Sequence, residues 1–69
     1  MTHLLFNTYE HTLELYDDNK NNDTFTNVST IKTHTEGYYE VLQKDDVSGK
    51  NKPLFRLPIV NTIIQYVHE

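Results

Sequence analysis

The stretch Phe55–Tyr66, FRLPIVNTIIQY, decides the interpretation of the fold. It is the most apolar run in the chain, yet it contains the only arginine and one of the two prolines. Its apolar residues alternate with other types up to Pro58, as they do in a strand with one buried face. Proline has no amide hydrogen, so Pro58 fits an edge or a corner better than a central strand. The stretch therefore predicts a strand that ends near Leu57, a corner at Pro58, and a further strand that begins near Thr62.

The strand after this corner has two apolar faces. On an alternating strand, Ile63 and Val67 point to one side, while Ile64 and Tyr66 point to the other. A chain of 69 residues forms one domain, 1–69, and buries only about 60% of the surface of its unfolded form. Either this strand is sandwiched between two layers, or one face and the open edge pair with another molecule. We expect a homodimer or a higher homo-oligomer.

The rest of the chain also favours strands. Valine, isoleucine and threonine supply eighteen residues, and alanine, the best helix former, is absent. Three further runs have the composition or alternation of strands, and polar runs or a tight turn separate them. The runs are HTLELYD (11–17), STIKTHT (29–35) and GYYEVLQ (37–43), and the breaks are DDNKNND (17–23), EG (36–37) and KDDVSGKNKP (44–53). We predict a mostly β fold, a small antiparallel meander or partly closed barrel of about five strands.

One segment permits a second interpretation. Leu5, Tyr9, Leu13 and Tyr16 are spaced by four, four and three residues, which also suits one face of a helix. A helix over residues 5–16 would change the fold to α+β, with that helix on a curved antiparallel sheet. The threonines and the β-favouring neighbours in this segment favour the strand.

Composition excludes several classes of function. There is no cysteine, so disulfides, thiolate metal sites and cysteine nucleophiles are ruled out. The formal charge of −4 disfavours nucleic acid as a partner. The N-terminal apolar residues lack a preceding cationic region, and no apolar run approaches the ~18 residues that span a membrane. We expect a cytoplasmic protein that does not bind membranes.

Two neighbouring features supply candidate binding residues. Arg56 is flanked by apolar residues and points away from their face, where its planar fork could bind a carboxylate or phosphate of a partner. The alternative is an intramolecular pair with Glu40 or Glu14 on a neighbouring strand. Of the adjacent pair Tyr38 and Tyr39, we expect Tyr39 in the core and Tyr38 in a binding surface.

The run between residues 17 and 23 is acidic. Asp17, Asp18 and Asp23 have the composition of a solvated loop that keeps a protein soluble. A sharper hypothesis is that these carboxylates imitate nucleic-acid phosphates and occupy a basic groove of a partner.

The histidines offer little for metal binding or catalysis. None of the four has a second histidine two or four residues away, and we predict no metal, no cofactor and no enzymatic activity. Neighbouring strands could still bring His11 and His34 together with Glu36. Two histidines and Lys32 could in principle act on RNA as acid, base and electrostatic stabiliser.

We therefore expect a non-catalytic binding protein. A composition poor in alanine, glycine and proline suggests an AT-rich genome and resembles that of many small phage and mobile-element accessory proteins, so the expected partner is a host protein that this chain inhibits or modulates. One alternative is an oligomer that sequesters a nucleotide-like ligand between subunits, around Arg56, Asn61 and the tyrosines. Another is a weak nuclease using His11 and His34. The predicted partner-binding residues are Arg56, Tyr38, Asn61, Tyr66, Ile64, Asp17, Asp18 and Asp23.

Overall fold

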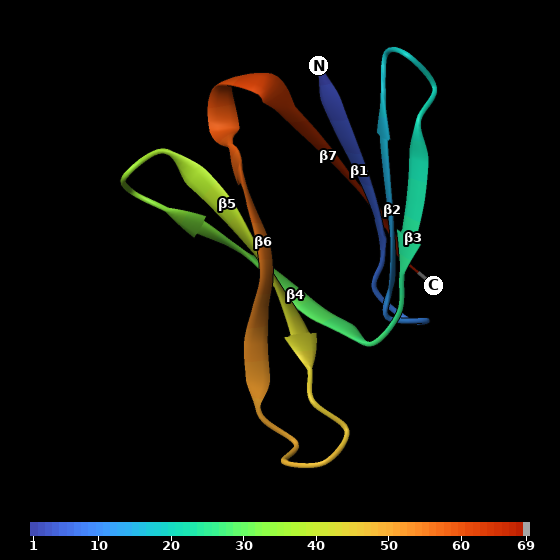
Figure 1. Ribbon diagram of the computed structural model, residues 1–69, viewed down its shortest axis with the longest axis vertical. Coiled ribbons are helices and arrows are strands. Elements are labelled where there is room, and N and C mark those ends of the chain that lie inside the picture. Colours follow the sequence, from blue (N-terminus) through green and yellow to red (C-terminus); the bar gives the residue numbers. More distant parts are fainter. Residues whose placement is uncertain (69) are drawn as a thin grey trace.

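Seven strands and one short 3₁₀ helix make up the fold in a computed structural model that describes residues 1–68 (Figure 1). No helix within these residues is long and apolar enough to cross a membrane. In chain order the elements are β1 (Thr2–Asn7), β2 (Thr12–Asp17), β3 (Asn22–Phe25), β4 (Val28–His34), β5 (Tyr38–Lys44), β6 (Asn51–Pro58), η1 (Ile59–Asn61) and β7 (Thr62–Val67).

The strands form two sheets, which confirms the predicted mostly β fold. The four-stranded sheet has the order β3-β2-β1-β7, and the three-stranded sheet has the order β4-β5-β6. All pairings are antiparallel except that of β1 with β7, which is parallel. The sheets do not close into a barrel, and the chain crosses from one to the other after β3 and again at η1 (Figure 1).

The segment 5–16, for which a helix was the alternative, is a β-hairpin. Strands β1 and β2 are joined by a turn that Asn7 closes. The amide of Glu10 donates to Oδ1 of Asn7, and the amide of His11 donates to the backbone carbonyl of Asn7, both at 2.9 Å. The register pairs Phe6 with Leu13. The helix alternative is wrong because the helix-like spacing combined residues that lie on opposite faces of this hairpin.

Two predicted connections are shorter than the sequence indicated. Strand β3 begins at Asn22, inside the polar run 17–23, and pairs with β2. Strand β6 begins at Asn51, inside the run 44–53, and contains Pro53. A strand accommodates proline when it lies at the edge of a sheet, and β6 is an edge of the three-stranded sheet.

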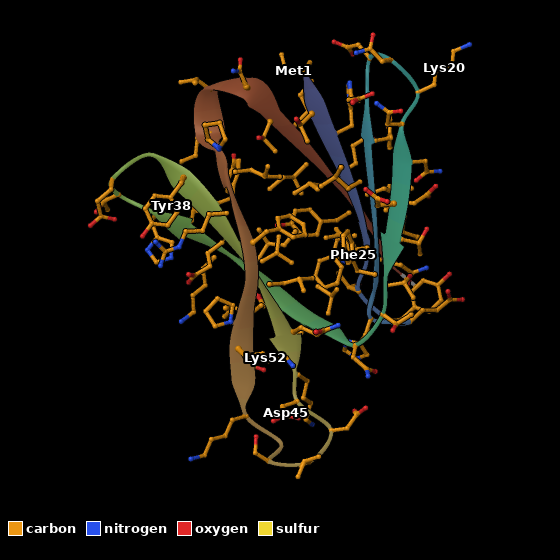
Figure 2. The ribbon with its side chains drawn as sticks, viewed as in Figure 1. Met1, Lys20, Phe25, Tyr38, Asp45 and Lys52 are labelled. Carbon is orange, nitrogen blue, oxygen red and sulfur yellow. The ribbon has the colours of Figure 1, made fainter. Side chains whose placement is uncertain are left out.

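The core lies between the two sheets (Figure 2). Phe25 on β3 and Phe55 on β6 pack with ring centroids 5.3 Å apart, so aromatic contact joins the sheets directly. The buried centre of the core draws on both sheets and consists of Leu4, Phe6, Leu13, Val28 and Val41.

The corner predicted at Pro58 is confirmed. η1 follows Pro58, and β7 begins at Thr62, whose hydroxyl donates to the Pro58 carbonyl at 2.7 Å. This corner brings β7 alongside β1, where Ile64 pairs with the buried Leu4.

Candidate functional site

The outer face of the three-stranded sheet carries a connected group of polar and aromatic side chains. In the register, Glu40 on β5 lies opposite Arg56 on β6, and Tyr38 on β5 lies opposite His34 on β4. Their neighbours along the strands, such as Val41, face the core, so alternation directs these four side chains outward. We call His34, Tyr38, Glu40 and Arg56 the Arg56 cluster.

Glu40 is the buried centre of the Arg56 cluster. Its side chain is only 9% exposed, and its two carboxylate oxygens are 3.0 Å from Nε of Arg56 and 3.1 Å from Nε2 of His34. The hydrogen bond from Arg56 holds the pKa of Glu40 below its ordinary value of 4.5; burial opposes this shift, and the hydrogen bond with His34 adds to it. Glu40 is therefore ionised near neutral pH. A buried carboxylate keeps its charge only when it is paired, and here Arg56 is the paired cation.

Tyr38 completes the setting of Arg56. Its ring stacks on His34, with centroids 4.4 Å apart, and Cζ of Arg56 lies 4.8 Å from the centre of the Tyr38 ring. The hydrogen bond to Glu40 and then the Coulomb interaction with Tyr38 raise the pKa of Arg56 above its usual range, so the guanidinium keeps its charge. The guanidinium is thus fixed from two sides, by a carboxylate and by an aromatic ring.

Arg56 nevertheless remains accessible. Its side chain is 59% exposed, and its two terminal nitrogens make no hydrogen bond to any residue in 1–68. The intramolecular pair of Arg56 with Glu40, one of the two alternatives, is confirmed, while Glu14 instead accepts a hydrogen bond from Asn22 at 3.1 Å. Because the pair uses only Nε of Arg56, it leaves the outer edge of the fork available to a partner.

The other aromatic and apolar candidates lie elsewhere. Ile64 packs against the core from β7. Tyr66 is 49% exposed, 6.0 Å from the ring of Phe6, and Asn61 is exposed on η1. Of the predicted aromatic and cationic residues, the structure therefore brings together only Arg56 and Tyr38.

Two of the three acidic candidates make intramolecular contacts. Asp17 accepts hydrogen bonds from the amides of Asn19 and Asn21 and closes the β2–β3 turn; these bonds, the one from the Asn21 amide foremost, lower its pKa. Asp18 pairs with the N-terminal amine at 3.0 Å and with His3 at 3.3 Å, and the hydrogen bond from that amine is the main reason that its pKa is lowered. Asp23 is exposed on the edge strand β3.

The histidines do not form one site. His34 lies at the end of β4, where Nδ1 is also 3.9 Å from Glu36, whereas His11 lies in the β1–β2 turn. Among residues 1–68 no three histidine, aspartate or glutamate side chains are grouped to hold a metal ion. The grouping of His11 with His34 that the metal and nuclease alternatives required is thus not assembled by residues 1–68.

Sequence reasoning missed the role of His34 in the Arg56 cluster, and it left Glu40 as one of two possible partners of Arg56. The signal was present in YYEVL, where Glu40 interrupts an otherwise apolar and aromatic run two residues after Tyr38.

Comparison with known proteins identifies no relative of this chain, because no family model, no curated protein and no solved structure matches it.

Proposed function

We propose that this chain is a non-catalytic binding protein that contacts a partner protein through the outer face of the three-stranded sheet. The observation that carries the proposal is the setting of Arg56, which is held by Glu40 at 3.0 Å and lies 4.8 Å from the Tyr38 ring while remaining 59% exposed. Arginine and tyrosine are among the residue types that dominate binding energy at protein interfaces. A side chain already fixed in its bound position loses little conformational entropy on association.

The charges around Arg56 define what it would recognise. Glu40 and Glu36 are both close enough to influence the guanidinium, and Lys32 lies opposite Glu40 on the same face. With two carboxylates and two cations, this face has almost no net charge, so long-range steering of a partner is weak. The terminal nitrogens of Arg56 would act at short range, on a carboxylate or a backbone carbonyl of the partner that also packs on Tyr38.

The nature of the partner rests on composition. A chain without alanine, with only two glycines and two prolines, resembles many small accessory proteins of phages and mobile elements. The partner in this proposal is a host protein in the cytoplasm, and binding inhibits or modulates that protein.

Self-association is a separate part of the proposal. Strand β7 is an edge of the four-stranded sheet, and Ile63 on its outer face is 43% exposed. An open edge with exposed apolar residues pairs readily with another strand. We expect a second copy of the chain to pair there, which leaves the Arg56 cluster on a different sheet free for the host protein.

A pull-down from a bacterial lysate with Arg56 variants tests this function. The wild-type protein should retain one partner at a constant ratio, Arg56→Ala should lose it, and Arg56→Lys should retain it poorly because an ammonium cannot reproduce the fork. Lys52→Ala is the matched control, since it removes an exposed positive charge from the same strand.

Salt separates this site from the acidic run. Binding through the Arg56 cluster should survive about 0.5 M salt, whereas binding through exposed carboxylates should be strongly screened. A partner that Arg56→Ala retains fully but salt releases would overturn the assignment to the Arg56 cluster, and a chain that retains no partner at either salt would overturn the proposed function itself.

A further inference from the structure

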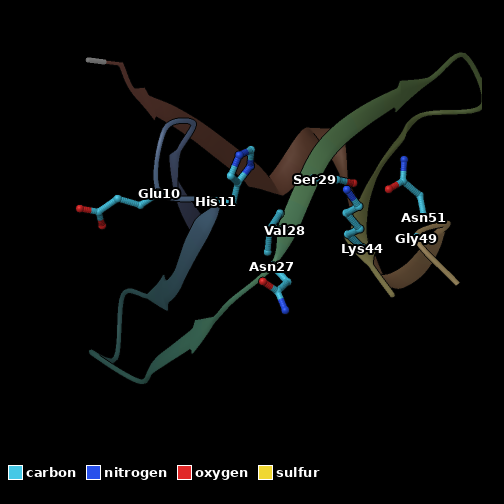
Figure 3. Close-up of a pocket in the computed structure, with 8 residues that line it drawn as sticks. All are labelled: Glu10, His11, Asn27, Val28, Ser29, Lys44, Gly49 and Asn51. Atoms are coloured by element: carbon cyan, nitrogen blue, oxygen red, sulfur yellow. The ribbon is translucent and has the colours of Figure 1, made fainter. Parts of the chain in front are cut away.

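A cleft of about 430 Å³ lies at the opposite end of β5 from Tyr38, away from the Arg56 cluster. It is formed by the β1–β2 turn, the junction of β3 with β4, and the connection between β5 and β6 (Figure 3). We call it the Lys44 cleft. Its volume falls in the range of about 300–1,000 Å³ that is typical of small-molecule sites.

Hydrogen-bond donors without internal partners line the Lys44 cleft. The side chains of Lys44, His11 and Asn51 make no hydrogen bond or ion pair with any residue in 1–68. In the view of Figure 3 these three side chains project in the same general direction, His11 on one side of the β4 ribbon and Lys44 and Asn51 on the other. A ligand in the cleft would thus meet an ammonium, an imidazole and an amide.

The carboxylates around the cleft do not neutralise these donors. Asp46 is held by the side-chain amide of Asn27, at 3.2 and 3.3 Å from its two oxygens. Glu10 lines the cleft, but Figure 3 shows its side chain extending away from Lys44. Asp45, next to Lys44, accepts hydrogen bonds from the amide of Val47 and the hydroxyl of Ser48. Lys44 therefore remains without a carboxylate partner within residues 1–68 and can meet an anion at short range, while the formal charge of −4 provides no long-range attraction.

The backbone shapes the cleft before any ligand binds. Three of its lining residues, His11, Asn27 and Gly49, have positive φ angles of 59°, 56° and 71°. Backbone hydrogen bonds hold the walls together, from Val28 to the His11 carbonyl at 2.9 Å and from Lys44 to the Asn27 carbonyl at 2.8 Å. Sparsely populated conformations persist where the surrounding structure fixes them, and they are concentrated at binding sites.

We propose that the Lys44 cleft binds the phosphate group of a small phosphomonoester. Separate donors such as Lys44, His11 and Asn51 suit the several oxygens of a tetrahedral phosphate, whereas a planar carboxylate is better matched by a single guanidinium fork. The cleft is larger than a bare phosphate requires, so the organic part of the ester occupies the remaining space, beside Val28 and Gly49. This site is independent of the proposed function at the Arg56 cluster, and either can fail without the other.

Amide chemical-shift mapping with defined probes tests the Lys44 cleft. Adenosine 5′-monophosphate and ribose 5-phosphate should move the amide signals of His11, Lys44 and Gly49 and leave that of Arg56 in place, while adenosine should move none of them. Lys44→Gln should weaken binding of both esters about tenfold or more, as expected for loss of a charge-assisted hydrogen bond.

Two further variants keep the test interpretable. His11→Asn retains a residue type that tolerates the positive φ of this turn while removing the imidazole, and it should weaken binding without unfolding the protein. Lys52→Gln removes a charge from β6 outside the cleft and should leave affinity within about twofold.

Several results would overturn the proposal. These are the absence of shifts at the cleft with either ester at millimolar concentration, shifts that persist unchanged in Lys44→Gln, and shifts as large with adenosine as with its monophosphate. Inorganic phosphate that binds as tightly as both esters would overturn the assignment of an ester and indicate a site for a bare anion.

Discussion

The orientation of the side chains on β7 can be tested with two adjacent isoleucines, Ile63 and Ile64. Ile64 pairs with Leu4 and packs against the core, whereas Ile63 pairs with His3 and is 43% exposed on the outer face. Replacing each by alanine removes the same three carbons from opposite faces of one strand. The difference between the two variants therefore isolates the effect of burial.

The structure gives the expected size of that difference. Removing three fully buried methylene-sized groups costs about 2.4 kcal/mol, and Ile64 is partly buried, so Ile64→Ala should lower the free energy of unfolding by about 2 kcal/mol. Ile63→Ala should cost about 0.5 kcal/mol, because the outer face has little to lose. A domain of this size shifts its Tm by about 4–8 °C per kcal/mol, which separates the two variants by roughly 6–12 °C.

Urea unfolding followed by tyrosine fluorescence and far-ultraviolet circular dichroism measures both costs, since the chain has five tyrosines and no tryptophan. Each variant should be measured at a low and a high protein concentration, because pairing of β7 with a second copy would add a concentration-dependent cost to Ile63→Ala. Equal costs at low concentration, or a larger cost for Ile63→Ala, would refute the reasoning, since a slip of one residue in the pairing of β1 with β7 exchanges the two faces.

Three further predictions follow from other parts of the molecule. The pKa values of Glu40, Asp17, Asp18 and Asp45 are lowered in the folded protein. The stability that these carboxylates contribute should therefore be complete above their ordinary pKa values, 4.5 for Glu40 and 3.8 for the aspartates, and be lost as the pH falls through the lowered values. A urea midpoint that stays constant across this pH range would contradict the assignment. Sedimentation equilibrium at micromolar concentration should show a dimer or larger species, and a monomer alone would remove the case for pairing at β7. Gly37→Ala should destabilise the fold more than Gly49→Ala in thermal unfolding. An added Cβ meets no atom at either position, so the difference comes from the backbone: the φ of 104° at Gly37 lies outside the left-handed helical region, whereas the φ of 71° at Gly49 lies close to it. The reverse order of the two variants would contradict this backbone argument.

The sequence predicted best those elements for which the alternation of apolar residues and the positions of proline and glycine indicate the same boundaries. The corner at Pro58, the start of β7 at Thr62 and the turn at Gly37 are all where the pattern placed them. Strand β3 was hidden because NDTF has no alternating apolar pattern, and its strand conformation depends on pairing with β2. Local composition cannot reveal a strand that tertiary pairing imposes on a polar segment.

The Arg56 cluster was predictable only in part. Alternation correctly directed Arg56 away from the face of its apolar neighbours, and it left Glu40 and Glu14 as two possible partners. The choice between them depends on strand order, because Glu40 lies beside β6 in the three-stranded sheet while Glu14 lies in the other sheet. Strand order depends on long-range contacts, and a single sequence without a recognised fold leaves it open.

The pair of Arg56 and Glu40 is poorly explained by stability alone. Replacing a buried ion pair by apolar residues of similar volume is often neutral or stabilising, because two charges must be taken out of water to form the pair. Only Glu40 is buried here, at 9% exposed, whereas the Arg56 side chain is 59% exposed. The free-energy cost of taking charge out of water therefore falls mostly on Glu40. In return, the guanidinium of Arg56 is fixed at the surface, with Cζ 4.8 Å from the centre of the Tyr38 ring. Such an arrangement fits the proposed role of Arg56 in recognition, and that role would account for a lone arginine within the most apolar stretch of the chain.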